Sequence, residues 1–216
     1  MQNVPPIVLE CPECREKYLV IDEPNLPSEN AICFSDGFYY DEQTWRTPGI
    51  IGCVTCELGF FPKNGKVIAT PDWDDFYENW FHIKKAEPPT AGSLALELRA
   101  RKKIDPVSEK IIRKEFWYSV NHTETGKVLF SRNTKFRDFW MESLTRLEKI
   151  MSPDIDVEKI IKAEINRNLG RFNICLDLLS GMNGKQVEAI REQAIKRNHL
   201  IFKLAETQGK YSHPKQ

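Results

Sequence analysis

The chain has 216 residues with 31 basic and 31 acidic side chains, so its formal net charge is zero. This length suits one or two domains with a buried core, and an apolar share of 41% is typical of a globular protein. No run of residues approaches about 18 apolar side chains, so the sequence predicts no membrane partner.

The charge is distributed unevenly along the chain. Residues 1–98 carry 7 basic and 16 acidic side chains, a net charge of about −9, whereas residues 99–216 carry 24 and 15, a net charge of about +9. A basic second half would suit a nucleic-acid surface. The asymmetry would equally suit contact with a neighbouring protein subunit.

Two Cys-x-x-Cys pairs, Cys11 with Cys14 and Cys53 with Cys56, form the most specific motif. Two thiolates at this spacing lie on one tight turn, and four complete a tetrahedral Zn²⁺ site. The 38 intervening residues, 15–52, are long enough for strands that return to the metal, as in a zinc ribbon. We therefore expect a structural zinc ion. A closed shell of four sulfurs leaves no position for water, which argues against zinc catalysis.

Other interpretations of the cysteines are two disulfides or a redox-active pair. Residues 1–10 lack the basic segment and long apolar run of a secretory signal, and no thioredoxin-like βαβ pattern is near. We therefore expect a reducing, cytoplasmic setting. Cys33 and Cys175 stand in apolar surroundings that predict burial, and Cys33 is a less favoured substitute ligand.

Short β-prone runs characterise the first half of the chain. Residues 18–21, 31–34 and 38–40 are predicted strands, and residues 35–37, Ser-Asp-Gly, predict a turn between the last two. Gly52, directly before the second cysteine pair, would let the backbone turn tightly and bring amides near a thiolate.

A helix is expected to begin at Thr70-Pro71-Asp72, which offers a capping hydroxyl followed by proline. Its aromatic residues follow an i, i+3, i+4, i+7, i+8 pattern on one face, namely Trp73, Phe76, Tyr77, Trp80 and Phe81. Core packing is the favoured interpretation of this face, and a stacking platform for bases is the alternative.

The proline-containing segment 87–92 resembles a linker. It predicts a zinc-ribbon domain with the aromatic helix over residues 1–86, a basic domain over 93–208, and a flexible tail over 209–216. The basic domain should open with a helix capped by Ser93, whose inward side chains are Leu94, Ala95 and Leu98.

Strands are predicted at residues 116–120 and 127–131, joined by a glycine-containing turn. From Thr134 onward three amphipathic helices are expected. Apolar stripes mark the first over 134–151, the second over 156–179 and the third over 185–205. Together they would form a small helical bundle. The predicted fold class is therefore α+β, a zinc ribbon followed by a strand hairpin and a bundle.

Basic side chains cluster after residue 98 and are candidates for phosphate contact. The candidates are Arg99, Arg101, Lys102, Lys103, Arg113, Lys114, Arg132, Lys135 and Arg137. Each could instead belong to a solvated helix face, and cations at a helix C-terminus also suit the helix dipole.

Recognised catalytic motifs are missing from the sequence. It contains no phosphate-binding GxxxxGK[ST], no GxSxG, no HExxH and no zinc-deaminase signature. We therefore expect neither enzymatic activity nor a small-molecule substrate.

The order of these parts resembles the zinc-finger large-subunit protein of type IV CRISPR–Cas effector complexes. The resemblance rests on the four paired cysteines, on residues 116–130 after a basic helix, and on a closing helix with Arg191, Arg197 and residues 201–205. It covers the layout of most of the chain, and the cysteine pairs are its one specific motif.

The resemblance implies a non-catalytic subunit that contacts guide RNA, target-adjacent duplex DNA and other effector-complex subunits, in an antiviral defence complex where base pairing reads the sequence. The basic residues above would be its nucleic-acid contacts. The alternatives are a stand-alone zinc-ribbon DNA-binding or transcription-regulatory protein, and a protein–protein assembly adaptor.

Overall fold

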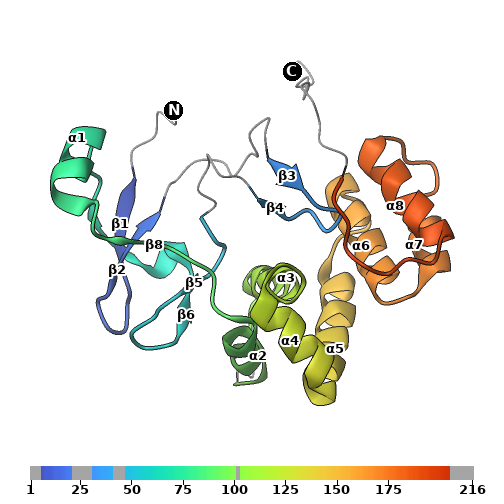
Figure 1. The fold of residues 1–216 in the computed structure, drawn as a ribbon, viewed down its shortest axis with the longest axis horizontal. Helices are drawn as coiled ribbons and strands as arrows, with labels where there is room; N and C mark the ends of the chain where they lie inside the picture. Colours follow the sequence, from blue (N-terminus) through green and yellow to red (C-terminus); the bar gives the residue numbers. More distant parts are fainter. Residues whose placement is uncertain (1–5, 21–30, 41–46, 101–102, 205–216) are drawn as a thin grey trace. The chain divides into compact units, whose positions relative to one another are not determined.

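The computed structural model describes residues 6–20, 31–40, 47–100 and 103–204 (Figure 1). The chain forms two compact units, the first from Met1–Asn25 and Arg46–Ile150, the second from Leu26–Trp45 and Met151–Gln216. These units differ from the expected division at residues 87–92, because the first unit includes chain on both sides of that segment. The predicted tail, 209–216, lies outside the described residues.

The first unit contains a four-stranded sheet in the order β7-β1-β2-β8. Strands β1 (Ile7–Glu10) and β2 (Lys17–Val20) form an antiparallel hairpin, which agrees with the β-prone run at 18–21 as far as it is described. Strand β7 (Lys66–Ala69) pairs antiparallel with β1, and β8 (Lys84–Lys85) pairs parallel with β2. A separate two-stranded sheet consists of β5 (Ile51–Gly52) and β6 (Gly59–Phe60), followed by the 3₁₀ turn Pro62–Asn64.

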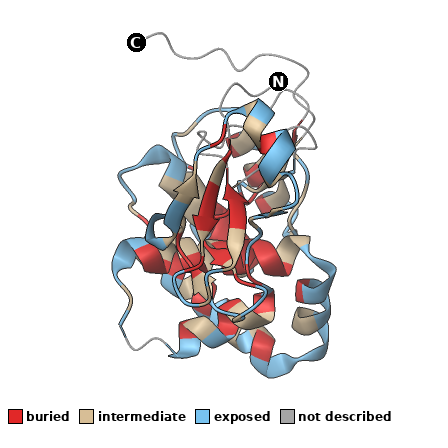
Figure 2. Ribbon diagram, turned by 90° about the vertical axis from the view of Figure 1, so that its left-hand side faces the viewer, coloured by how far each residue is buried: buried red, intermediate tan, exposed pale blue. Residues whose placement is uncertain are grey.

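A small apolar core joins these two sheets. Leu9 lies opposite Tyr18 in the β1–β2 hairpin, and both pack with Val20, Ile51 and Phe60. The Tyr18 and Phe60 rings are 6.0 Å apart between centroids. Figure 2 shows these central strands as largely buried. Alternation along short strands thus turns one side of each toward a shared interior.

The predicted aromatic helix is only partly correct. It consists of one α-turn, α1 (Trp73–Asp75), and a π-helical segment, η2 (Phe76–Trp80), and its cap is Asp72 rather than Thr70. Because the π-helix has a wider turn, the expected spacing no longer gathers the rings on one buried face. Phe76 is buried, whereas Tyr77 and Phe81 are 65% and 66% exposed.

Four helices complete the first unit: α2 (Ala91–Ala100), α3 (Pro106–His122), α4 (Glu124–Arg132) and α5 (Thr134–Ile150). The three residues predicted to face inward on α2 are all buried, although Thr90, not Ser93, caps the helix. The stripe on α5 is confirmed as well, with Phe136, Trp140, Leu144 and Leu147 buried. None of the described helices is both long and apolar enough to cross a bilayer.

The two strands predicted at 116–120 and 127–131 are wrong, because both segments are helical, in α3 and α4. Phe116, Trp117 and Tyr118 favour strands by propensity, but packing between helices buries all three and overrides that preference. Thr123 caps α4 by accepting a hydrogen bond from the Gly126 amide at 3.0 Å. The glycine that suggested a hairpin turn is therefore inside a helix.

The second unit begins with the hairpin of β3 (Ile32–Cys33) and β4 (Tyr39–Tyr40), which confirms the predicted pair and the turn between them. Helices α6 (Asp156–Asn168), α7 (Phe172–Leu178) and α8 (Lys185–Ile195) pack together around Cys175, Leu179 and Ile190. The predicted burial of Cys175 is confirmed, whereas Cys33 is only half-buried.

The predicted bundle needs three corrections. Its first helix, α5, belongs to the first unit. The second predicted helix is divided, because Gly170 adopts a φ of +74° between α6 and α7. The third ends at Ile195, and the chain beyond it is extended, since the Leu204 amide donates to the Cys33 carbonyl at 2.9 Å.

A buried ion pair holds the extended segment against α6. Glu164 and Arg167 are both fully buried, and Arg167 Nε lies 2.8 Å from Glu164 Oε2. The guanidinium also donates to the carbonyls of Asn198 and Leu200 and lies over the Phe202 ring. Burial raises the pKa of Glu164, and the Arg167 charge opposes that rise.

Replacing Arg167 with methionine should destabilise the second unit strongly. The change leaves a buried carboxylate and two backbone carbonyls without their partner, a loss of about 3–5 kcal/mol. Urea unfolding, monitored by far-ultraviolet circular dichroism, measures this loss of stability. Lys196→Gln is the control, because its pair with Glu192 is exposed and should change stability little. Equal midpoints for both variants would contradict the structural role of Arg167.

The helical assignment of residues 124–132 is tested by Gly126→Ala. A Cβ at this position would lie 2.2 Å from the Ser119 carbonyl oxygen and 2.7 Å from Val120 Cα, so we expect a loss of about 1–3 kcal/mol. The matched variant Gly92→Ala has its nearest atom at 3.8 Å and should gain about 0.5–1 kcal/mol, since alanine favours a helix. Thermal unfolding that moved in the same direction for both would be inconsistent with this close helix crossing.

Candidate metal centre

Two turns of the same shape carry the cysteine pairs. The first knuckle, residues 11–14, is the turn between β1 and β2, and the second knuckle, residues 53–56, is the turn between β5 and β6. In the first, the Cys11 amide donates to the Glu16 carbonyl at 2.8 Å. In the second, the Cys53 amide donates to the Leu58 carbonyl at 3.0 Å. Each hairpin therefore presents its two thiols from one tight turn.

Backbone conformation is repeated after each knuckle. Arg15 and Glu57, the residues that directly follow Cys14 and Cys56, have φ values of 66° and 59°. This left-handed conformation is uncommon for residues other than glycine. Its occurrence at equivalent positions shows that the two knuckles reverse the chain in the same way.

The four predicted ligands come together. Their sulfur atoms all lie within 4.8 Å of one another, with Cys11 Sγ 3.8 Å from Cys56 Sγ and Cys14 Sγ 3.3 Å from Cys53 Sγ. Zinc–sulfur bonds of about 2.3 Å in a tetrahedron require sulfur separations of about 3.8 Å. Disulfides would need about 2.0 Å. The cluster can thus hold one metal ion, and its four-sulfur chemistry favours zinc over hard cations.

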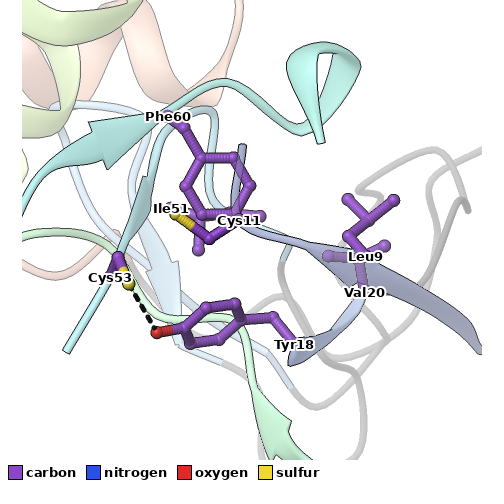
Figure 3. Close-up of a cluster of buried hydrophobic side chains, with 7 residues drawn as sticks. All are labelled: Leu9, Cys11, Tyr18, Val20, Ile51, Cys53 and Phe60. Carbon is purple, nitrogen blue, oxygen red and sulfur yellow. Dashed lines mark hydrogen bonds between the residues drawn. The ribbon is translucent and has the colours of Figure 1, made fainter. Parts of the chain in front are cut away.

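Tyr18 supports this cluster from within the core (Figure 3). Its hydroxyl donates to Cys53 Sγ at 3.3 Å and accepts from the Val54 amide at 2.9 Å. Such outer-shell hydrogen bonds orient a metal ligand and adjust its basicity. Sequence reasoning treated residue 18 as part of a strand only, and nothing in its spacing from the cysteines marks this contact.

The surroundings of the four thiols differ. Burial opposes ionisation of Cys53, but hydrogen bonds from Tyr18, the Cys56 amide, Cys14 and the Thr55 amide outweigh it and lower the pKa to about 6. Burial raises the pKa of Cys56 to about 12, and neighbouring cysteines raise that of Cys14. A metal ion bound by all four sulfurs would displace the protons that remain on the thiols.

Gly52 has a different role from the one expected. Its amide donates to the Glu87 carbonyl at 2.8 Å rather than to a thiolate. A Cβ there would lie 2.8 Å from Pro89 Cα, so only glycine lets residues 88–89 cross so close to the second knuckle. This contact fixes the path of the chain from the metal centre to α2.

The predicted nucleic-acid contacts occupy diverse environments. Arg101 and Lys102 lie outside the described residues. The Arg99 guanidinium lies 4.3 Å from the centroid of the Phe139 ring, and Lys114 Nζ lies over the Tyr118 ring. Lys103, Arg132 and Lys135 are exposed and Arg137 is half-buried.

Arg113 belongs to an internal polar network. Its Nε donates to Glu109 at 2.8 Å and its Nη1 to Ser143 at 3.0 Å. Arg146 also donates to Glu109 through two nitrogens, each at 2.9 Å. These guanidinium groups lower the pKa of the Glu109 carboxyl, with Arg146 as the main cause. The network joins α3 to α5, and the sequence did not single it out.

Comparisons with known proteins add no relative: no family model, no curated protein and no solved structure matches this chain.

One zinc ion per chain is the expected metal content. Cys53→Ser should abolish tight zinc binding and unfold the hairpins of the first unit, because metal binding and local folding are one equilibrium there. Elemental analysis together with circular dichroism before and after chelation measures both effects. Cys33→Ser is the control, since Cys33 lies on β3 of the second unit. Free titration of all four paired thiols in the native protein, without metal, would refute the site.

Proposed function

We propose that this chain is a non-catalytic nucleic-acid-binding protein whose N-terminal hairpins are held by a structural zinc ion. The observation that carries the proposal is a group of cations where α4 ends and α5 begins. We call it the cationic junction, and it consists of Arg132, Lys135 and Arg137.

The position of these cations favours an anionic ligand. Lys135 and Arg137 lie in the first turn of α5, where the helix dipole is positive and cations are disfavoured. That turn contains no acidic residue. Asn133 caps the helix by accepting from the Phe136 amide at 3.0 Å. A phosphate would offset the unfavourable charge and would also meet the exposed Arg132.

Several other candidates have contacts that explain them without a ligand. Arg99 is at the C-terminus of α2, where a cation suits the dipole, and it also packs on Phe139. Arg113 is committed to Glu109 and Ser143. The proposal therefore depends on the cationic junction rather than on all nine basic residues.

The metal centre supports a non-catalytic role. Four cysteine sulfurs fill a tetrahedral shell, so a bound zinc ion would have no open position for water or substrate. Binding of zinc by the knuckles would supply folding free energy and stabilise the hairpins of the first unit.

More specifically, we propose that this chain is a subunit of an RNA-guided CRISPR effector complex. A stand-alone zinc-ribbon regulator and an assembly adaptor are the alternatives. Purification with the products of neighbouring genes discriminates them by mass analysis of what co-elutes. A defined small RNA and a repeated backbone subunit would support the complex, whereas polymerase would favour the regulator and a protein partner without nucleic acid the adaptor.

Substitution of the cationic junction tests nucleic-acid binding directly. Arg132→Gln with Lys135→Gln should weaken binding to a single-stranded RNA of fixed length and to duplex DNA. Each lost phosphate contact should reduce the slope of log affinity against log salt by about 0.7–0.9. Fluorescence anisotropy across a salt series measures both the affinity and its dependence on salt.

The matched control is Lys149→Gln, an exposed cation in the last turn of the same helix. It should leave the slope unchanged. Equal losses for the control and the double variant, or no binding by the unmodified protein at low salt, would exclude the cationic junction as the binding surface.

A further inference from the structure

We propose that a groove formed by the two knuckles and α2 docks a segment of a partner protein that carries lysine or arginine beside large apolar side chains. This site is separate from the cationic junction and takes a ligand of opposite charge. It concerns a protein partner and does not depend on nucleic-acid binding.

The groove lies wholly within the first unit. Its volume is about 610 Å³, a size that accommodates a few side chains of a peptide. One wall is the first knuckle with Pro12 and Glu13, the base is the chain from Cys56 to Phe61, and the other wall is α2. The two cysteines that border it, Cys11 and Cys56, connect its shape to the metal centre.

Exposed leucines line the groove. Leu58 and Leu96 are 55% and 68% exposed, whereas Phe60 and Phe61 at the base are buried. Leu96 lies apart from the inward residues of α2, which are Leu94, Ala95 and Leu98, so core packing does not account for it. Large apolar side chains gathered in a hollow are typical of a protein interaction site.

The charge of the groove identifies the kind of partner. Three carboxylates line it, from Glu13, Glu57 and Glu97, and its described lining contains no lysine, arginine or histidine. The Glu97 carboxylate lies over the base, because a Cβ on Gly59 would be 2.6 Å from Glu97 Oε2. The Lys63 ammonium lies over the ring of Phe61, a lining residue, so one cation borders the groove beside its three carboxylates.

A further charge would have the same sign, because four thiolates around one Zn²⁺ would leave a net negative charge beside the groove. A phosphate backbone would be repelled here. A basic segment with apolar anchors matches both the carboxylates at the edges and the leucines between them.

Selection from a random 12-residue peptide library displayed on phage, against the immobilised zinc-loaded chain, tests the proposal. We expect the enriched peptides to have net positive charge and at least one Leu, Ile, Phe or Trp. The tightest of them, made synthetically and labelled, then serves as the probe in anisotropy titrations.

Two sets of groove variants should each weaken that probe at least tenfold. Leu58→Ser with Leu96→Ser removes the apolar contacts, and Glu13→Lys with Glu57→Lys reverses the charge. Glu78→Lys, an exposed acid on η2 outside the groove, should change the affinity less than twofold. Zinc content and circular dichroism establish that every variant is folded, which is expected because all the substituted side chains are exposed.

Three results would overturn the proposal. These are the absence of enriched peptides, enrichment of acidic ones, and binding that the groove variants leave unchanged. A second copy of this chain is the other possible occupant, and sedimentation of the free chain tests for it. Self-association that is lost in Leu58→Ser with Leu96→Ser would assign the groove to a dimer instead. None of these results bears on RNA or DNA binding by the cationic junction, so the two proposals fail independently.

Discussion

The approach of four cysteine sulfurs to within 4.8 Å of one another is the constraint on which the first half of the structure depends. The hairpins that carry them have strands of four and two residues, too short to be stable alone. Their shared core is also small, so a structural zinc ion, worth about 10–16 kcal/mol in small zinc domains, would dominate the local free energy. Tyr18 joins the two contributions, because its ring packs on Phe60 while its hydroxyl contacts Cys53.

In the second unit a buried ion pair, rather than a metal site, holds distant parts of the chain together. Arg167 connects α6 to the chain at residues 198–202 through two carbonyls and a ring. A buried ion pair of this kind contributes little net stability over an apolar core of similar volume, yet the loss of one partner is costly. Its contribution is to specify one path for an extended segment, together with the packing of Phe202 against the apolar core of the second unit.

Local signals were sufficient where chemistry or a turn residue fixes geometry, and insufficient where packing decides. Spacing alone predicted that the four paired cysteines come together, and Ser35-Asp36-Gly37 predicted the β3–β4 turn because Gly37 supplies the positive φ of 82°. The segment around Trp117 is wrongly predicted as a strand, since a short apolar run is also compatible with a buried helix and contacts with α5 decide between them. Glu164 and Arg167 resemble an exposed pair three residues apart on a helix, and nothing in the sequence marks their burial.

The two proposed binding surfaces differ in charge, with carboxylates in the groove and basic side chains at the cationic junction. The groove and the cationic junction both belong to the first unit but depend on different parts of it. The groove is bordered by Cys11 and Cys56, one cysteine from each knuckle. In the helices α3 to α5, Phe116, Trp140 and Leu144 are buried, and α3 contacts both α4 and α5. Loss of a bound metal ion would therefore act more directly on the groove than on the cationic junction, which contains none of the four cysteines.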